Sequence, residues 1–183
     1  MATVLVPLAQ GMEELEAVTI IDLLRRAGIE VVTAGLDANP VEGSRGTVVI
    51  PDTTLDFALE RQYDMVVLPG GLPGATNLEA DSRIITLVKK MASEDRFTAA
   101  ICAAPKVLAR AGVLEGKRAT SYPGALDPAQ WPQVRQENRA VVTDGKVITS
   151  RGPGTAMDFA LELIRSLAGQ NKRNQVEAGL QRG

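Results

Sequence analysis

The sequence predicts an α/β fold in which helices cover both faces of a mainly parallel β-sheet. Short apolar runs rich in β-branched residues recur along the chain, and helical segments separate them. Most of these runs are apolar throughout, which is the pattern of strands buried on both faces. The length of 183 residues, with 45% hydrophobic and 23% charged residues, favours one folded domain over residues 1–183.

Six runs are predicted to be strands, and the segments between them supply helices. The predicted strands cover residues 3–8, 29–35, 47–50, 64–69, 98–101 and 147–150. Between the first two strands, apolar residues at helical spacing predict a helix that Gly28 closes, because glycine is the preferred residue after a helix end. The result is a strand-helix-strand unit, as a parallel sheet requires.

Three further helices are predicted from their end signals and apolar stripes. One covers residues 81–91, and another follows Cys102 and ends at Gly112. The last strong helix begins at Thr155, whose hydroxyl is expected to cap it.

The composition excludes several classes of function. With no histidine and a single cysteine, the chain cannot form a Cys/His metal cluster, a Cys-His or Ser-His catalytic pair, or an internal disulfide, so we expect no metal. A net charge of -2 provides no general attraction for nucleic acids or membranes. The N-terminus lacks the basic region of a signal peptide, and no apolar run approaches the ~20 residues that span a bilayer. We expect a cytoplasmic protein with no membrane partner.

Cys102 lies where a buried strand meets the following helix. Such an elbow exposes a nucleophile at the carboxyl edge of the sheet, and the free N–H groups of the helix are expected to favour a thiolate. The alternative is a buried cysteine that acts as a small hydrophobic residue. The small alanines on both sides of Cys102 favour the reactive cysteine.

Glu16 belongs to an acidic cluster with Glu13 and Glu14 at the start of the first predicted helix. Solvated carboxylates at a helix N-terminus explain Glu13 and Glu14. Glu16 instead shares a helical edge with Ile20 and Leu23, so burial is expected to raise its pKa and favour the neutral acid. A protonated Glu16 would be able to donate a hydrogen bond to a thiolate.

Two glycine-rich clusters, residues 69–74 and 152–154, directly follow predicted strands. Ligand sites in open parallel sheets form at the carboxyl ends of strands, so both clusters are candidate site walls. The Gly70-Gly71 turn would present backbone N–H groups to an oxyanion. The Gly70-Gly71 motif matches neither a phosphate-binding loop nor the dinucleotide fingerprint, so we expect no nucleotide cofactor.

Several sequence blocks resemble the signatures of the ThiJ/PfpI superfamily. The two clearest contain Cys102 and the Gly70-Gly71 turn, and the others agree with the deglycase branch of this superfamily over nearly the whole chain. The blocks cover residues 99–105, 66–71, 11–16, 24–28, 44–45 and 149–155. The resemblance implies a flavodoxin-like three-layer sandwich and a homodimer formed through the first helix, where Leu15 and Val18 offer a second apolar face.

The resemblance also implies roles for individual residues. It implies a reactive Cys102 that oxidises readily to a sulfinate, with a protonated Glu16 beside it. The backbone groups of Gly71 and Ala103 would supply the oxyanion donors. The residues expected to line the pocket near the dimer seam, partly from the other subunit, are Gly70, Arg26, Arg45 and Pro153.

The activities that the resemblance implies need no cofactor. They are glyoxalase action on small aldehydes such as methylglyoxal and glyoxal, deglycase action on glycated groups, a chaperone role and sensing of oxidative stress. Nucleic acid would enter only as a substrate of deglycation. The superfamily also includes intracellular proteases, whose sites use a histidine next to the cysteine, and this chain has no histidine.

Tyr122 is the main departure from the family pattern, because the resembling proteins carry a histidine before the proline that follows it. An unperturbed tyrosine has a pKa of about 10, so Tyr122 can donate a proton but is a poor general base. Its alternative role is a simple pocket wall. We therefore expect either a slow glyoxalase in which Glu16 moves the proton, or a redox sensor whose Cys102 sulfinate Glu16 stabilises. A structural cysteine without chemistry is the third alternative.

Overall fold

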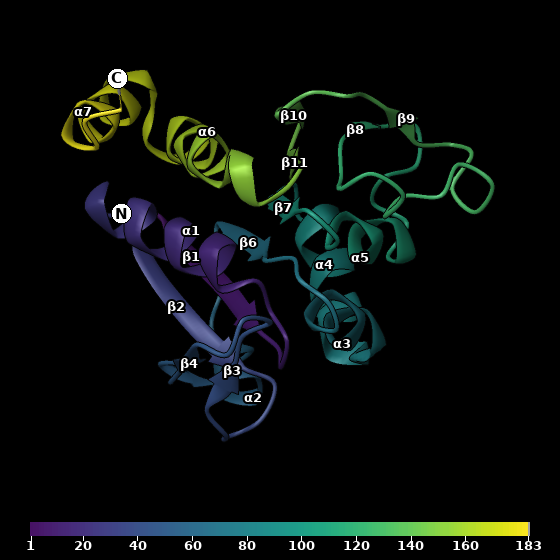
Figure 1. The fold of residues 1–183 in the computed structure, drawn as a ribbon, viewed down its shortest axis with the longest axis horizontal. Helices are drawn as coiled ribbons and strands as arrows, with labels where there is room; N and C mark the ends of the chain where they lie inside the picture. The colour runs from purple at the N-terminus through teal and green to yellow at the C-terminus, as the bar shows by residue number, and fades with distance from the viewer. Residues whose placement is uncertain (183) are drawn as a thin grey trace.

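The computed structural model describes residues 1–182 and is built around a sheet of seven strands (Figure 1). The strand order is β10-β11-β7-β6-β1-β2-β5. In chain order the strands are β1 Thr3–Leu8, β2 Glu30–Gly35, β5 Thr53–Thr54, β6 Met65–Leu68, β7 Phe97–Ile101, β10 Val141–Asp144 and β11 Val147–Ser150. Within the described residues, every neighbouring pair in this sheet is parallel except β10 with β11. The predicted mainly parallel sheet is confirmed.

Helices cover both faces of the sheet and bury two apolar clusters against it. One face carries α1 Glu14–Arg26, α6 Ala156–Ala168 and α7 Gln170–Gly179, and the other carries α2 Leu55–Ala58, α3 Gly74–Ala80, α4 Ser82–Ser93 and α5 Pro105–Arg110. Figure 1 shows α1 beside α6, and α3, α4 and α5 grouped apart from them. Along β1, Leu5 packs into one cluster, whereas Val4 and Val6 pack into the other. The predicted three layers are therefore present.

Two small sheets lie outside the central one. β3 Val41–Glu42 and β4 Val48–Val49 form an antiparallel hairpin, and β8 Arg118–Ala119 pairs in parallel with β9 Arg135–Gln136. The strand predicted over residues 47–50 belongs to this hairpin and not to the central sheet. Because the side chain of Ile50 is exposed, the apolar pattern of this segment does not reflect burial in the core.

The predicted helix ends hold, with one correction at Thr155. α1 ends before Gly28, whose φ of 76° needs glycine, and Asp81 caps α4 with its carboxylate. The Thr155 hydroxyl does not cap α6. It bonds to the carbonyl of Gly152 at 2.9 Å and accepts from the N–H of the same residue at 3.1 Å. The reason is that Thr155 ends the 3-10 turn Pro153–Thr155, so its hydroxyl bonds back to Gly152, although α6 begins at Ala156 as a cap at Thr155 predicts.

The domain predicted over residues 1–183 includes Gly183, which lies outside the described residues. None of the helices among residues 1–182 combines the length and the apolar character needed to cross a membrane.

Candidate functional site

Cys102 lies at the elbow between β7 and α5, where the sequence predicts it. Its φ of 63° lies in the left-handed region, which residues other than glycine rarely adopt. The backbone is held there from both sides, because Cys102 N–H donates to the Ser150 carbonyl at 3.0 Å and Tyr122 N–H donates to the Cys102 carbonyl at 2.8 Å. The side chain of Cys102 is 8% exposed. Strained elbows of this kind occur where a protein presents a nucleophile.

Glu16 lies in the first turn of α1, and its side chain is fully buried. Glu16 Oε2 accepts a hydrogen bond from Gly70 N–H at 2.8 Å. Among the described residues, Oε1 is buried without a well-aligned hydrogen-bond partner, although the Cys102 thiol is close enough to interact with the carboxyl. A proton on the Glu16 carboxyl would therefore supply a donor for the neighbouring thiol.

Burial raises the pKa of Glu16 from 4.5 to about 7. Interactions with Cys102 and with Gly70 N–H oppose this rise, and the charge of Glu13 adds to it. The rise has the direction predicted from the helical edge on which Glu16 lies, because desolvation disfavours the ionised carboxylate. Glu16 therefore keeps a proton up to a pH at which an exposed carboxyl has lost it.

The pKa of Cys102 is also raised, to about 12, first by burial and then by the charge and hydrogen bonding of Glu16. The N–H groups of Gly71 and Ala103 act in the opposite direction. The backbone donors therefore favour a thiolate, in the direction predicted for the elbow, but the buried environment and the neighbouring carboxylate outweigh them. A thiolate at Cys102 requires the proton of the pair to reside on Glu16.

The glycines after β6 let three segments meet closely. A Cβ added at Gly70 would lie 2.6 Å from Cys102 Cβ and 2.7 Å from Glu16 Oε2. A Cβ added at Gly71, whose φ is 90°, would lie 2.3 Å from Glu13 N. Any larger residue would push Cys102 and Glu16 apart, so this turn needs glycine for the close approach as well as for its backbone angles.

Tyr122 and Pro153 lie at the same edge of the sheet as Cys102. The backbone of Tyr122 supports the elbow, whereas its side chain is 53% exposed. A Cβ at Gly152 would be 3.5 Å from Tyr122 Cδ2, so the ring stands beside Gly152 and the turn that Pro153 begins. Within residues 1–182, the Tyr122 hydroxyl makes no hydrogen bond to a protein group, which leaves it available to solvent or to a ligand.

Unlike Tyr122 and Pro153, the predicted pocket residues Arg45 and Arg26 make contacts away from Cys102. Arg45 lies in the β3–β4 connection, where its N–H donates to Glu14 Oε1 at 2.9 Å, and its side chain is exposed. Arg26 ends α1 and pairs with Asp22 at 2.9 Å. Along the helix it lies about 15 Å from Glu16, at 1.5 Å per residue. A role for Arg26 at this site therefore requires a second copy of the chain.

Two residues brace the elbow, of which Ser150 is not singled out from the sequence and Thr155 is predicted only as a helix cap. Ser150 Oγ donates to the Ala140 carbonyl at 2.8 Å and lies 2.7 Å from Thr155 Oγ1, while its carbonyl accepts from Cys102 N–H. Ser150 and Thr155 are buried. The cluster over residues 152–154 is the predicted site wall, and residues 149–155 carry the family resemblance, but a serine at the end of an apolar strand carries no further local signal.

The donor set of the site does not resemble a metal centre. Glu16 and Cys102 are two potential ligands, whereas protein metal sites generally use three or four. No group of three or more His, Cys, Asp or Glu residues among residues 1–182 is arranged to hold a metal ion.

The fold and the site define a class of α/β proteins in which a cysteine stands on a strand-to-helix elbow beside a buried carboxyl. The chain belongs to the DJ-1/PfpI family, whose model matches residues 2–166. The resemblance to the ThiJ/PfpI superfamily is thereby confirmed.

Individual relatives resemble the chain over nearly its whole length. Protein dj-1beta of Drosophila melanogaster is 45% identical over 177 residues, which cover 96% of this chain and 95% of that protein. The crystal structure of Drosophila DJ-1beta superposes with a TM-score of 0.94 at 43% identity and covers 100% of this chain and 98% of that one. The structure titled "Toxoplasma gondii DJ-1, oxidized" has a TM-score of 0.93 at 38% identity and covers 98% of both chains. A Caenorhabditis elegans relative named glutathione-independent glyoxalase DJR-1.2 is 33% identical over 175 residues, 96% of this chain and 92% of that protein.

Proposed function

We propose that this protein is a slow, cofactor-independent glyoxalase or deglycase that acts on methylglyoxal, glyoxal or their adducts. The observation that carries the proposal is the contact between the elbow residue Cys102 and the buried carboxyl of Glu16, which has a raised pKa. The glyoxalase name of the worm relative supports the same class of reaction.

The reaction begins when the Cys102 thiolate attacks the aldehyde carbon of methylglyoxal. A C–S bond forms, the carbonyl electron pair moves to oxygen, and the resulting hemithioacetal oxygen is held by the N–H groups of Gly71 and Ala103. Glu16 takes the proton that left the thiol and passes it to the ketone oxygen, which becomes the hydroxyl of lactate. Its carboxylate is then free to accept the proton of the former aldehyde carbon and deliver it to the adjacent carbon. The product is a thioester of lactate, which water cleaves to lactate and free Cys102.

Tyr122 sets the expected rate. Where the resembling proteins carry a histidine, this chain has a hydroxyl that is a poor base near neutral pH. The loss of one general acid–base group typically costs ~10²–10⁴-fold in rate. Glu16 must then carry both proton transfers, which makes slow turnover the expected result.

The second candidate function is a redox sensor, and the lack of a histidine partner for Cys102 favours it. Two equivalents of hydrogen peroxide would each give one oxygen to the thiolate sulfur and leave as water, producing first a sulfenate and then a sulfinate. Glu16 and the backbone donors would stabilise the sulfinate, and the oxidation state would regulate a partner or chaperone surface. The solved structure of the Toxoplasma relative is described as oxidized.

The proposal also covers the oligomeric state and the cellular location of the protein. The protein forms a homodimer through α1, where Leu15 and Val18 are 52% and 47% exposed, and Arg26 and Arg45 approach the site across the seam. It acts in the cytoplasm in response to aldehyde or oxidative stress, and nucleic acid meets it only as a glycated substrate.

The test is lactate production from methylglyoxal under reducing conditions, measured by chromatography. Wild-type protein should form lactate, and both Cys102→Ser and Glu16→Gln should lose this activity, whereas the exposed-site control Glu60→Gln should retain it. Tyr122→His should raise the rate, because it restores a base that titrates near neutrality.

Two experimental outcomes would overturn the glyoxalase proposal. Normal turnover by Glu16→Gln would remove Glu16 from the mechanism. If wild-type protein forms no lactate although mass spectrometry shows reduced Cys102, the sensor is the better explanation, and sulfinate formation with peroxide should then persist.

A further inference from the structure

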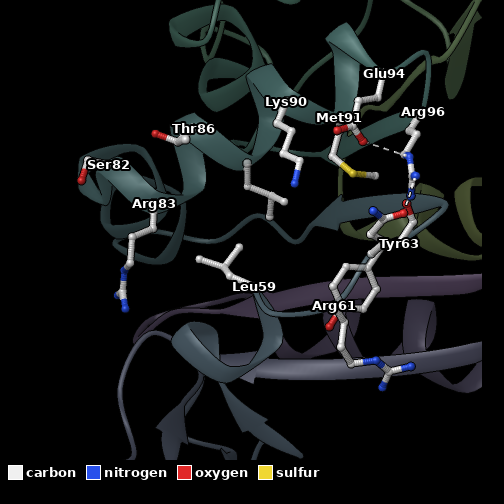
Figure 2. Close-up of a pocket in the computed structure, with 12 residues that line it drawn as sticks. Leu59, Arg61, Tyr63, Ser82, Arg83, Thr86, Lys90, Met91, Glu94 and Arg96 are labelled. Atoms are coloured by element: carbon white, nitrogen blue, oxygen red, sulfur yellow. Dashed lines mark hydrogen bonds and ion pairs between the residues drawn. The ribbon is translucent and has the colours of Figure 1, made fainter.

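A cavity of about 320 Å³ opens on the face of the sheet that α4 covers, away from Cys102. It lies between α4 and the segment that joins α2 to β6 (Figure 2). Its apolar lining comes from Leu59, Tyr63, Leu87 and Met91, of which the last three are buried. The Tyr63 hydroxyl already donates to the Ala58 carbonyl at 2.9 Å, so the ring offers the cavity an apolar face.

Two arginines brace the walls of this cavity. Arg83 pairs with Asp81 at 2.6 Å and Asp56 at 2.7 Å, which ties α4 to α2. Arg96 donates to the Tyr63 carbonyl at 2.6 Å and pairs with Glu94 at 3.2 Å. Because the contacts of Arg83 with Asp56 and of Arg96 with Tyr63 cross from one wall to the other, the cavity is held open in the folded chain. The charges of both arginines are already matched by carboxylates.

Lys90 is the cation of this cavity that lacks a carboxylate partner. Arg61, the remaining lining cation, pairs with Glu30 at 2.8 Å. Lys90 forms no ion pair with any residue that the structure describes. Figure 2 shows its amino group pointing into the cavity, toward the side where Leu59 and Met91 lie. The cavity therefore combines an apolar interior with one unmatched positive charge at its rim.

We propose that this cavity binds a small apolar molecule that carries a single carboxylate, with the carboxylate on Lys90 and the apolar body over Leu59 and Met91. At about 30 Å³ for each water-sized group, the cavity accommodates roughly ten non-hydrogen atoms. Pockets with apolar walls and few polar anchors are the common form of small-molecule sites, and the pairing of one cation with one anion supplies the orientation. The site is independent of Cys102, which does not line it.

The experiment compares octanoate with octanamide, which have the same size but differ in charge. Each is titrated into ¹⁵N-labelled protein, and the amide shifts give both the location and the dissociation constant. Octanoate should shift the amides of Leu59, Leu87 and Met91 but not that of Cys102, and it should bind more tightly than octanamide. In Lys90→Gln, octanoate should bind about fivefold more weakly, the upper range for an ion pair at an exposed position, and octanamide should be unaffected.

Lys89→Gln is the matched control, because the neighbouring lysine on α4 has the same charge and does not line the cavity. It should change the affinity for octanoate by less than twofold. Leu59→Trp should fill the cavity and weaken both ligands, with circular dichroism to verify the fold. Shifts that map elsewhere, equal affinity of wild-type protein for the two ligands, or an unchanged octanoate affinity in Lys90→Gln would each overturn the proposal.

Discussion

At the scale of single residues, the chemistry of the site depends on two groups that share one buried space. Glu16 is desolvated by the apolar face of α1, and Cys102 is desolvated at the end of β7. A negative charge on Glu16 raises the pKa of Cys102, whereas the neutral thiol lowers the pKa of Glu16, so the pair favours a single negative charge near neutral pH. The N–H of Gly70 stabilises this charge on the Glu16 carboxylate, and the N–H groups of Gly71 and Ala103 stabilise it on the Cys102 sulfur.

The raised pKa of Glu16 makes folding stability depend on pH. In the folded chain this pKa is about 7, above the value of about 4.3 expected for an unfolded chain. Between these values the folded state binds more protons than the unfolded state, so the stability falls as the pH rises through this window. We expect Cys102→Ser protein to lose roughly 3 kcal/mol relative to Cys102→Ser/Glu16→Gln between about pH 5 and about pH 8.

Urea unfolding of both variants at the two pH values measures this difference. The Cys102→Ser background removes the coupled thiol and prevents oxidation during the experiment. Cys102→Ser/Glu60→Gln is the control, because Glu60 is exposed and forms no ion pair with the residues described. A stability difference that does not change with pH would show that Glu16 titrates as an exposed carboxyl does.

At the scale of elements, local signals predict the helices and central strands well and the edge strands poorly. β5 has two residues and β10 contains the polar pair Thr143 and Asp144, so neither shows the apolar run that identifies β1 or β7. Both lie at the edges of the sheet, where pairing with one neighbour holds them in place. Edge strands of this kind are defined by the partner they meet and not by their own composition.

The capping of α4 gives a test at this scale. Asp81 Oδ1 accepts from Arg83 N–H at 2.9 Å, and its carboxylate pairs with the Arg83 guanidinium at 2.6 Å. Asp81→Ala should lower the free energy of unfolding by about 1–2 kcal/mol, because it removes the cap and the ion pair together.

Asp81→Asn separates these contributions, because asparagine is also a good cap but carries no charge. It should cost less than about 1 kcal/mol, the usual range of a partly exposed ion pair. Chemical denaturation of the three proteins provides the comparison. An equal loss in both variants would attribute the effect to the ion pair and not to the cap.

At the scale of the whole molecule, the parallel sheet brings distant segments to one edge. β1, β6, β7 and β11 all run in the same direction, so the segments that follow them meet at their carboxyl ends. Glu16 and Gly70 are 54 residues apart in sequence, but Gly70 N–H donates to Glu16 Oε2 at 2.8 Å. The opposite, solvent-facing side of α1 leaves Leu15 and Val18 exposed, which is the basis of the proposed dimer.

The proposed dimer predicts a change in molecular mass. Wild-type protein should elute at twice the mass of the chain, and Leu15→Glu/Val18→Glu should be monomeric, because burying two carboxylates in an apolar interface is unfavourable. Size-exclusion chromatography with light scattering measures the mass. Phe57→Glu is the control, since Phe57 is 67% exposed on α2 and lies on the other face of the sheet. A monomeric wild-type protein, or a dimer that survives the double substitution, would contradict the interface.

The sequence by itself determined the α/β class, the order of the central strands and helices along the chain, the elbow at Cys102 and the absence of a histidine at position 122. These features depend on hydrophobic periodicity, on residues that end helices and on residue identity, all of which are local. Burial of Glu16 was also predictable in direction, because its helical edge is apolar.

Only the tertiary structure decided which groups face one another and how far their pKa values shift. The missing Thr155 cap and the hairpin at residues 47–50 result from contacts with residues nearby in the chain, which the cap signal and the apolar pattern do not show. The raised pKa of Cys102 and the position of Lys90 at the cavity result from the packing of segments distant in sequence. Desolvation and hydrogen bonding depend on the distances between such segments, and those distances exist only after the sheet and its two helical layers have packed.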